Sequence, residues 1–272
     1  MQNTAARNNK GYPVSVEGLT YSPSPDVAPV LNNIKLEIKG GEFVSVIGPN
    51  GAGKSSLLAA IAGELPGIEG RITIHAEPVD KPVNRVIDGV GVVHQQDKLD
   101  LIGHLSIAQN IFIRQLLGGG SKNRIMGVCE TWCTDIAARL HKHAPNLRRP
   151  HNTLVKYLAG GERQMLSTAI AIHFEHEQNP CALLLLDEHT AHLDAQNGKE
   201  VMDYTAAQIT ETGCTAIMVT HRRQDALDHS DKIIVLEKGR LLGKIDNPKS
   251  LTIHSLETEI HKFREEQKRM TQ

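Results

Sequence analysis

The chain has 272 residues, 40% of them hydrophobic, and its 30 lysines and arginines nearly balance its 31 aspartates and glutamates. This length and composition suffice for a buried core and lie a little above the usual single-domain range, so we expect one domain with subdomains. The near-neutral charge gives no broad electrostatic basis for binding nucleic acid, and none is expected. The longest apolar run, Cys181–Leu186, is far shorter than the ~20 residues of a membrane span. Because the first residues also lack the apolar stretch of a signal peptide, we expect a soluble, cytosolic chain.

Cysteines and histidines give no metal or disulfide pattern. Four cysteines at 129, 133, 181 and 214 lack C-x-x-C spacing, which favours reduced thiols that serve as packing residues. Fourteen histidines are scattered along the chain. Pairs such as His141 with His143, or His173 with His176, lack cysteine or carboxylate companions at ligand spacing, so we expect them on solvated helix faces.

Residues 11–45 contain short segments of alternating polarity, interrupted by turn signals at 21–25 and 39–41. Alternation of this kind between proline and glycine clusters is typical of β-strands joined by tight connections. We therefore expect an antiparallel β subdomain in this part of the chain.

A phosphate-binding motif follows the apolar run Glu42–Ile47, which predicts a buried strand. Gly48–Ser55 fits the pattern G-x-x-x-x-G-K-Ser/Thr, and a Leu- and Ala-rich helix is expected over 55–62. Glycines let successive N–H groups face phosphates, Lys54 supplies charge, and Ser55 offers a hydroxyl to Mg²⁺. A glycine-rich hairpin would not have this strand before it and this helix after it. The expected nucleotide-binding residues are Gly48, Pro49, Asn50, Gly51, Ala52, Gly53, Lys54, Ser55 and Ser56.

The middle of the chain carries helical patterns and a glycine pair. Residues 105–145 predict helices interrupted by a flexible loop at Gly118–Ser121. Gly160 and Gly161 then open a helix that is expected over 165–172. Because paired glycines at a helix start leave N–H groups open to an anion, the sequence predicts a second phosphate-facing segment here.

Two carboxylates end the apolar strand predicted at Cys181–Asp187. In P-loop enzymes an aspartate in this place holds Mg²⁺, directly or through water, so Asp187 is a candidate metal ligand. Glu188 is a candidate general base for the water that attacks the γ-phosphate. Alone, an acidic pair after a strand would indicate a turn or a helix N-cap. Together with the phosphate-binding motif, the catalytic interpretation is the better one.

Apolar runs at Thr215–Thr220 and Lys232–Leu236 predict further strands separated by helices, as a parallel sheet requires. The tail at 250–269 has three apolar residues at helical spacing: Leu256, Ile260 and Phe263. This pattern, with charges between, predicts a peripheral amphipathic helix.

Leu158–Glu162, with the letters LAGGE, resembles the signature motif of ABC ATPases, usually LSGGQ, and the other expected motifs follow in the family's order. The resemblance covers nearly the whole chain. It implies an α/β fold with a P-loop NTPase core and parallel sheet, an N-terminal antiparallel β subdomain and an inserted α-helical subdomain. Within one domain over 1–272, the expected parts are 11–45 (antiparallel β), 46–96 with 176–245 (nucleotide-binding core), 97–175 (helical and signature subdomain) and 246–272 (C-terminal helix).

The resemblance also implies roles for single residues. Tyr21 is similar to the aromatic that stacks on adenine, with an ordinary strand aromatic as the alternative. Gln95 is similar to the Q-loop glutamine that joins Mg²⁺ and senses a transmembrane partner, although the adjacent Gln96 leaves the register open. Asp194 resembles the D-loop residue that crosses a dimer, and His221 resembles the switch histidine on the γ-phosphate. The implied catalytic residues are Lys54, Gln95, Glu188 and His221, the metal ligands are Ser55, Gln95 and Asp187, and the signature residues that face nucleotide are Ala159, Gly160, Gly161 and Glu162.

Several residues depart from the family pattern. Ala159 replaces the signature serine, whose hydroxyl reaches the γ-phosphate held by the opposite subunit. Since a hydrogen bond to a charged group contributes about 1.5–3 kcal/mol, we expect a working but slow ATPase. Glu162 replaces glutamine and adds negative charge, which is expected to be mildly unfavourable or neutral. His189, where most members have proline, and the long spacing from Gln95 to Leu105 resemble a bacterial subgroup proposed to take up tryptophan, tyrosine or related small solutes.

The implied function is that of a subunit that hydrolyses ATP, forms a homodimer around two Mg-ATP and drives import of a small solute, for example an amino acid. Its partners would be an integral-membrane permease and a periplasmic or lipoprotein solute-binding protein, and its place the cytoplasmic face of the cell membrane, as a peripheral protein. Three alternatives stay open: the ATPase of an efflux system, a non-transport ABC ATPase, and a nucleotide-sensing regulator. A single nucleotide domain without a long coiled-coil insertion argues against the non-transport class.

Overall fold

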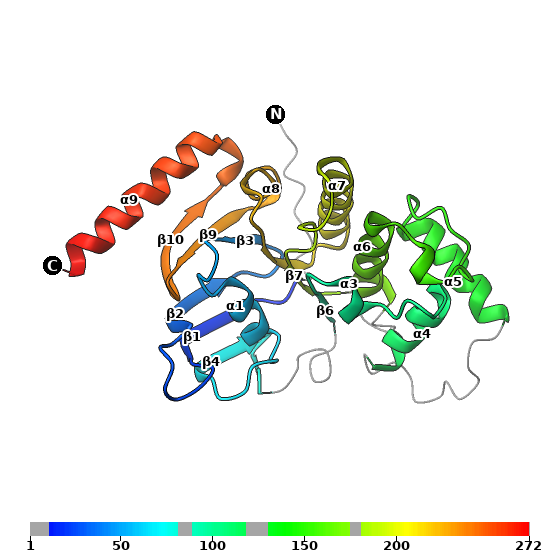
Figure 1. The fold of residues 1–272 in the computed structure, drawn as a ribbon, viewed down its shortest axis with the longest axis horizontal. Helices are drawn as coiled ribbons and strands as arrows, with labels where there is room; N and C mark the ends of the chain where they lie inside the picture. Colours follow the sequence, from blue (N-terminus) through cyan, green and yellow to red (C-terminus); the bar gives the residue numbers. More distant parts are fainter. Residues whose placement is uncertain (1–10, 81–88, 118–129, 175–180, 272) are drawn as a thin grey trace. The chain divides into compact units, whose positions relative to one another are not determined.

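The computed structural model describes residues 11–80, 89–117, 130–174 and 181–271. The chain divides into two compact units, one formed by Met1–Pro82 with Gly213–Gln272 and the other by Val83–Thr212. Figure 1 shows the elements of both units in colours that follow the sequence. The predicted loop at Gly118–Ser121, and Cys129 and His176, lie outside the described part of the chain.

An antiparallel sheet in the first unit has the strand order β2-β1-β4-β5. Its strands are β1 (Val14–Tyr21), β2 (Leu31–Ile38), β4 (Glu69–Ile74) and β5 (Glu77–Pro78). The apolar residues of β2 are buried and the polar residues between them are not, as a sheet with one covered face requires. The expected sheet in residues 11–45 therefore forms from β1 and β2, and β4 and β5 join it from beyond residue 45.

The second sheet of this unit is built around β3 (Phe43–Ile47). This strand pairs in parallel with β8 (Thr215–Val219) and with β9 (Lys232–Glu237), and β10 (Arg240–Asp246) pairs antiparallel with β9. Every residue of β3 and β8 is buried, because parallel strands are covered on both faces. The unit also contains α1 (Lys54–Ile61), α8 (Arg223–His229), η3 (Pro248–Ser250) and α9 (Ile253–Thr271). The predicted strands at 42–47, 215–220 and 232–236 and the helix at 55–62 are confirmed.

The C-terminal helix α9 confirms the expected amphipathic tail and lies along β10 (Figure 1). Leu256 and Ile260 are buried in an apolar cluster with Ile233 and Val235 of β9, and Phe263 packs against the same cluster. Phe263 also fills the space above Gly243 of β10, where an added Cβ would lie 2.3 Å from its Cδ2 atom. The packing of Phe263 of α9 against β10 therefore requires glycine at position 243.

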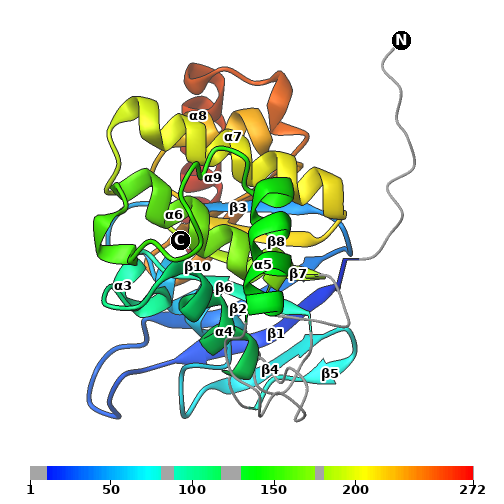
Figure 2. The ribbon, with the colours of Figure 1, turned by 90° about the vertical axis from the view of Figure 1, so that its right-hand side faces the viewer.

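The second unit pairs β6 (Val90–Val93) in parallel with β7 (Leu183–Asp187) and adds a group of helices. These are α3 (Asp97–Asp100), α4 (Ile107–Leu117), α5 (Glu130–His143), η1 (Val155–Tyr157), α6 (Gly160–Ala169), η2 (Ile170–Phe174) and α7 (Ala195–Thr212). Figure 2 shows α4, α5 and α6 close to one another. Their core includes Ile107, Ile136, Leu166 and Phe174, all fully buried. The expected α-helical part is confirmed.

Helix α6 differs from the predicted helix over 165–172 in its ends. It begins at Gly160, and after Ala169 the chain continues as the π-helical segment η2. The glycine pair does not delay the helix because its first two positions need no intrahelical N–H partner. The N–H groups of the signature segment are therefore those of the first helical turn.

His173, which was expected on a solvated helix face, is packed instead, and His189 is buried as well. The ring of His173 in η2 stacks on His143 of α5 with a centroid distance of 4.0 Å, and burial lowers the pKa of His173 to about 4. His189, which follows β7, is only 3% exposed, and burial lowers its pKa to about 4 as well. Both imidazoles are therefore neutral at pH 7. The expectation failed because helical spacing alone does not reveal which face a neighbouring helix covers.

We predict that Gly243→Ala lowers the free energy of unfolding by about 1–3 kcal/mol, because the new methyl group overpacks the site that Phe263 fills. Chemical denaturation measures the loss. The penalty should shrink in a Phe263→Ala background, where the methyl group has room. Gly103→Ala is the control, since an added Cβ there meets no atom closer than 3.7 Å; equal losses in both variants would contradict the packing explanation.

Stability should also depend on pH through His189. Its folded pKa lies below the unfolded value, so protons bind the unfolded chain more strongly between about pH 4 and 6.5. This contribution is complete above pH 6.5 and is lost as the pH falls. Between pH 7 and pH 5 we expect wild type to lose about 2 kcal/mol more than His189→Gln, measured by denaturation at each pH. Parallel pH profiles of the two proteins would show that His189 is not buried as a neutral base.

Candidate functional site

The phosphate-binding motif forms a tight loop between β3 and α1. Gly53 is the N-cap of α1 in the left-handed conformation, with φ of 95°, and a Cβ there would lie 2.7 Å from the carbonyl oxygen of Val30. No side chain caps the helix. Lys54 is 5% exposed, and its Nζ donates to the carbonyl oxygens of Gly48 and Pro49 at 3.2 Å each. A cation and the N–H groups of a helix start thus meet in one loop, which suits a phosphate.

His221 and Tyr21 belong to the same unit as this loop. Strands β3 and β8 are parallel neighbours with Val46 opposite Val219, so the segments that follow them leave the same edge of the sheet. His221 is exposed and sits in a turn closed by the bond from Arg222 N to Thr220 Oγ1 at 3.0 Å.

Tyr21 is half-buried at the end of β1 and pairs with Leu31 of β2. The Cδ2 atom of Leu31 lies 3.0 Å from an ideal Cβ at Gly53, so this strand end borders the phosphate loop. An aromatic ring at this place is compatible with stacking on a base. The structure therefore brings Tyr21, residues 48–56 and His221 together in one unit.

In the second unit, Gln95 meets Glu188. Val93 of β6 lies opposite Leu186 of β7, which puts the residues two positions beyond them side by side. The Nε2 atom of Gln95 donates to Glu188 Oε2 at 3.2 Å, whereas Gln96 is exposed. Glu188 has φ of 46°, a left-handed conformation that costs energy for a residue with a side chain and is often found at functional sites. Its neighbour Asp187 ends β7 and is half-buried.

The signature segment starts α6 without a serine. Ala159 occupies the N-cap position and has no side-chain oxygen to accept a bond from the first turn. Glu162 supplies half of a capping box, because its Oε2 accepts the Ala159 N–H at 2.8 Å. Arg149 Nε donates to Glu162 Oε1 at 2.8 Å. Burial acts to raise the pKa of Glu162, but the bonds from Arg149 and Ala159 outweigh it and lower that pKa. The extra charge is therefore paired within the chain, in line with the mild effect expected of it.

Asp194 caps α7. Its Oδ1 accepts the N–H groups of Gln196 at 3.1 Å and Asn197 at 2.9 Å, and the bonds from Asn197 lower the pKa of Asp194. The residue is exposed. Its carboxylate therefore stabilises the start of α7, a role that the resemblance to the family did not imply.

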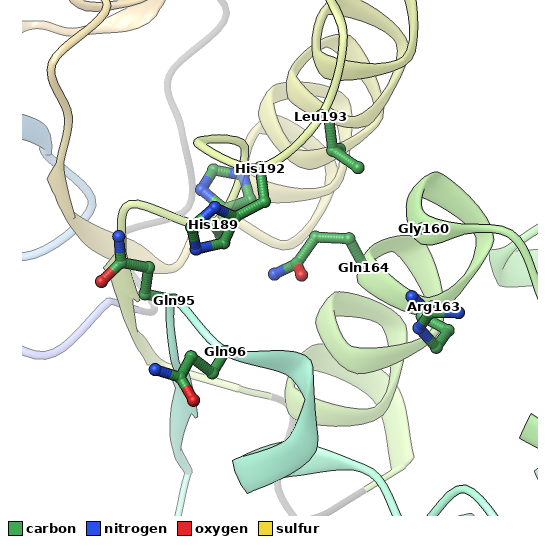
Figure 3. A pocket seen from close by; sticks show the side chains of 8 residues that line it. All are labelled: Gln95, Gln96, Gly160, Arg163, Gln164, His189, His192 and Leu193. Atoms are coloured by element: carbon green, nitrogen blue, oxygen red, sulfur yellow. The ribbon is translucent and has the colours of Figure 1, made fainter. Parts of the chain in front are cut away.

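A cavity of about 270 Å³ lies among the Gln95 segment, α6 and the segment before α7 (Figure 3). It is lined by Gln95, Gln96, Gly160, Arg163, Gln164, His189, His192 and Leu193. Gln164 is 5% exposed and points into this space, and its Nε2 is buried without a hydrogen-bond partner. The Nε2 atom of His189 lies 3.2 Å from Thr205 Oγ1. The cavity is therefore a polar space beside Gln95 with a buried donor.

Sequence reasoning missed Gln164, Arg149 and Asp100, a buried carboxylate beside the Gln95 segment. Gln164 lies two residues after the signature, so its position was an available signal. Arg149 and Asp100 had none, since their bonds to Glu162 and Ser167 span 13 and 67 residues along the chain, and the bonds of Asp100 to His94 depend on the course of the segment between them. The predicted site residues themselves form two groups, one in each unit.

Comparison with known proteins agrees with the motifs. Residues 31–191 match the family described as ABC transporter. A tyrosine transport ATP-binding protein of Clostridioides difficile (strain R20291) is 30% identical, over 84% of this chain and 90% of that protein. The spermidine/putrescine import ATP-binding protein PotA of Pseudomonas fluorescens (strain Pf0-1) is 31% identical, over 85% of this chain and 61% of that protein.

Two solved structures are similar in fold. The dimeric post-hydrolysis state of the ATP-binding cassette MJ0796, bound to ADP and Pi, has a TM-score of 0.70 and 25% identity, with 86% of this chain and 98% of that chain covered. The structure of cbiO1 from Clostridium perfringens, part of the ABC transporter complex cbiONQ, has a TM-score of 0.69 and 26% identity, with 87% and 88% covered. The resemblance carried by the motifs is thereby confirmed. This chain belongs to the ABC transporter family, as one of its ATP-binding and ATP-hydrolysing subunits.

Proposed function

We propose that this chain energises the import of a small solute, an amino acid in the first instance, through a separate integral-membrane permease. Two copies would pack head to tail around two Mg-ATP. The observation that carries the proposal is the contact of Gln95 with Glu188, because it joins the glutamine that senses a partner to the carboxylate that acts on water. The names of the tyrosine transport and spermidine/putrescine import relatives support uptake of small solutes.

Nucleotide binding is the task of the first group of residues. The N–H groups at the start of α1 and the ammonium of Lys54 face the phosphates, and the helix dipole adds to their attraction. Tyr21, at the border of the phosphate loop, supports the base. His221 leaves the same sheet edge as the loop, which fits a donor to the γ-phosphate.

Hydrolysis needs a carboxylate that holds a water molecule. Glu188 stands at the carboxyl end of β7, and Gln95 fixes the orientation of its carboxylate by donating to Oε2. Orientation matters because positioning and electrostatics supply most of the rate enhancement in phosphoryl transfer. We assign Glu188 as the residue that orients and deprotonates the attacking water.

The residues also fit a magnesium ion. Hydroxyl, carboxylate and amide oxygens are ligands of the kind that Mg²⁺ prefers. Ser55 offers a hydroxyl in the first unit, and Asp187 and Gln95 offer a carboxylate and an amide oxygen in the second. When bound, the ion would neutralise charge on the β- and γ-phosphates.

The signature segment is the reason for a dimer. Gly160 and Gly161 carry N–H groups of the first turn of α6, and Ala159 has no side-chain oxygen that could accept from them. In the proposed assembly these groups complete the site on the opposite subunit. Loss of the γ-phosphate would then remove a link between the subunits and open the dimer.

The proposed partners follow from this role. Within the described residues no helix is long and apolar enough to cross a bilayer. A permease would provide the path, a periplasmic or lipoprotein binding protein would deliver the solute, and the chain would lie peripherally at the cytoplasmic face. Co-purification in detergent tests this arrangement, because a membrane subunit should accompany the chain.

One observation favours a second function. Ala159 lacks the hydroxyl that the signature serine would supply, and a weakened contact to the γ-phosphate fits a nucleotide-sensing regulator that hydrolyses little. Such a protein would bind ATP and dimerise without appreciable turnover.

We predict that Ala159→Ser raises kcat for ATP hydrolysis by about tenfold to a hundredfold, because it restores a bond to a charged group worth about 1.5–3 kcal/mol in the transition state. Steady-state phosphate release measures the change. Ala138→Ser on an exposed part of α5 is the matched control and should leave kcat unchanged. An unaltered or lower kcat in Ala159→Ser would contradict the role assigned to position 159.

The two-site mechanism predicts that wild-type hydrolysis rises more steeply than linearly with protein concentration. Glu188→Gln should abolish hydrolysis while retaining bound ATP, and Lys54→Ala should weaken ATP binding itself. Both are measured by phosphate release beside equilibrium binding. Glu77→Gln, in the exposed strand β5, is the control. Full activity in Glu188→Gln would refute the assignment of the base, and ATP binding without hydrolysis in wild type would favour the regulator.

A further inference from the structure

We propose that Asp100 is a positioning residue for Gln95, and that its carboxylate ties the segment carrying Gln95 to the signature helix α6. This inference rests on the proposed function, in which Gln95 takes part in hydrolysis. Its starting point is a carboxylate whose side chain is only 1% exposed. A charge buried to this extent is tolerated only when it is paired and hydrogen-bonded. The partners of Asp100 therefore indicate what the residue holds in place.

Two of these bonds come from His94. Asp100 Oδ2 accepts the backbone N–H of His94 at 2.9 Å, and Oδ1 lies 2.7 Å from His94 Nδ1. The two bonds close residues 94–100 into a loop whose ends are joined at one carboxylate. His94 directly precedes Gln95. The bond from the His94 N–H to Asp100 therefore holds the backbone from which the Gln95 side chain leaves. Strand β6 ends just before this point, and its pairing with β7 cannot by itself fix the residues beyond Val93.

The third bond reaches α6. Ser167 Oγ donates to Asp100 Oδ2 at 2.9 Å, and Ser167 is 2% exposed. Helix α6 begins at Gly160, so Ser167 lies two turns after the signature N–H groups on the same rigid element. One carboxylate therefore connects the Gln95 loop with the helix that carries the signature.

A cation completes the cluster. Arg114 of α4 has its Nη1 atom 3.7 Å from Asp100 Oδ1, and its Nη2 donates to the carbonyl oxygen of Val92 at 3.4 Å. The same guanidinium thus balances the buried charge and contacts the end of β6. Three elements converge on Asp100, and a shift of the backbone that carries Gln95 requires either that these bonds break or that α6 moves with the loop.

Substitution by asparagine keeps the shape and removes the charge. The amide NH₂ cannot accept a bond, so the variant keeps at most one of the two accepting oxygens, must donate to His94 Nδ1 if the other bonds are kept, and loses the charge beside Arg114. We expect Asp100→Asn to lower kcat for ATP by about tenfold to a hundredfold, as for loss of a bond to a charged group. The KM for ATP should change less than kcat, because the contacts of Lys54 within the phosphate loop do not involve Asp100.

The test compares Asp100→Asn and Ser167→Ala in wild type and in a Gln95→Ala background, with Asp203→Asn as an exposed carboxylate control on α7. Hydrogen exchange of the amides at 94–96 gives a readout that does not depend on turnover. Positioning through Gln95 predicts that Asp100→Asn lowers kcat in wild type, has no further effect in Gln95→Ala, and speeds exchange at 94–96. Ser167→Ala should show a smaller loss of the same kind.

Each contrary outcome has a distinct meaning. An equal loss of kcat in both backgrounds would show a merely structural role and overturn the inference, as would an unchanged kcat in Asp100→Asn. If Asp100→Asn does not fold, Ser167→Ala decides by the same comparison. If wild type itself does not hydrolyse ATP, the proposed function fails. Independently of turnover, unchanged hydrogen exchange at 94–96 in Asp100→Asn or Ser167→Ala would overturn the inference that Asp100 holds the Gln95 segment in place.

Discussion

Register between parallel strands is the constraint on which the rest of the site depends. Parallel neighbours send their following segments out of the same edge of a sheet, so residues an equal distance beyond paired positions meet. The pair Val93 and Leu186 brings Gln95 to Glu188 in one unit, and the pair Val46 and Val219 sets His221 beside the phosphate loop in the other. A slip of either pairing by one residue would turn side chains to the opposite face and separate these groups. In β3 and β8, which are buried on both faces, a slip would also misplace close-packed side chains on each face.

The second requirement is that two helices begin without a capping side chain at the N-cap, which costs helix stability. Helices α1 and α6 begin at Gly53 and Ala159, and neither residue has a side chain that can accept a bond from the first turn. Alanine in place of a capping residue commonly costs about 1 kcal/mol of helix stability, whereas glycine costs less. At the start of α6, Glu162 offsets part of this cost because it accepts the N–H of Ala159. Lys54 does not replace a cap, since its ammonium donates to the carbonyl oxygens of Gly48 and Pro49 and so ties the start of α1 to the phosphate loop.

Local sequence motifs made most of the fold predictable, together with the position of the phosphate loop and of the acidic strand end. The phosphate loop, the acidic strand end and the alternation of strands with helices are written in contiguous residues, and their elements were found where the sequence put them. The contacts that distinguish one residue from the next residue in the sequence were not predictable. The sequence does not distinguish Gln95 from Gln96, and the register of β6 against β7 places Gln95 rather than Gln96 opposite Glu188. The burial of His189 and Asp100 was equally hidden, because it depends on α6 and α7 rather than on adjacent residues.

The departures of this chain from its family are connected by charge. Replacing the signature serine by Ala159 removes a donor, and replacing glutamine by Glu162 adds a negative charge at the same helix start. Taken separately, both changes weaken the attraction for a phosphate. The structure links them, since Glu162 orients the amide of Ala159 and Arg149 balances the carboxylate. Because Arg149 is partly exposed, solvent screens this pair, and its effect is on the orientation and local charge of the signature rather than on stability. The signature segment of this chain thus keeps the backbone N–H groups of a helix start, and the Glu162 side chain helps to hold them in place.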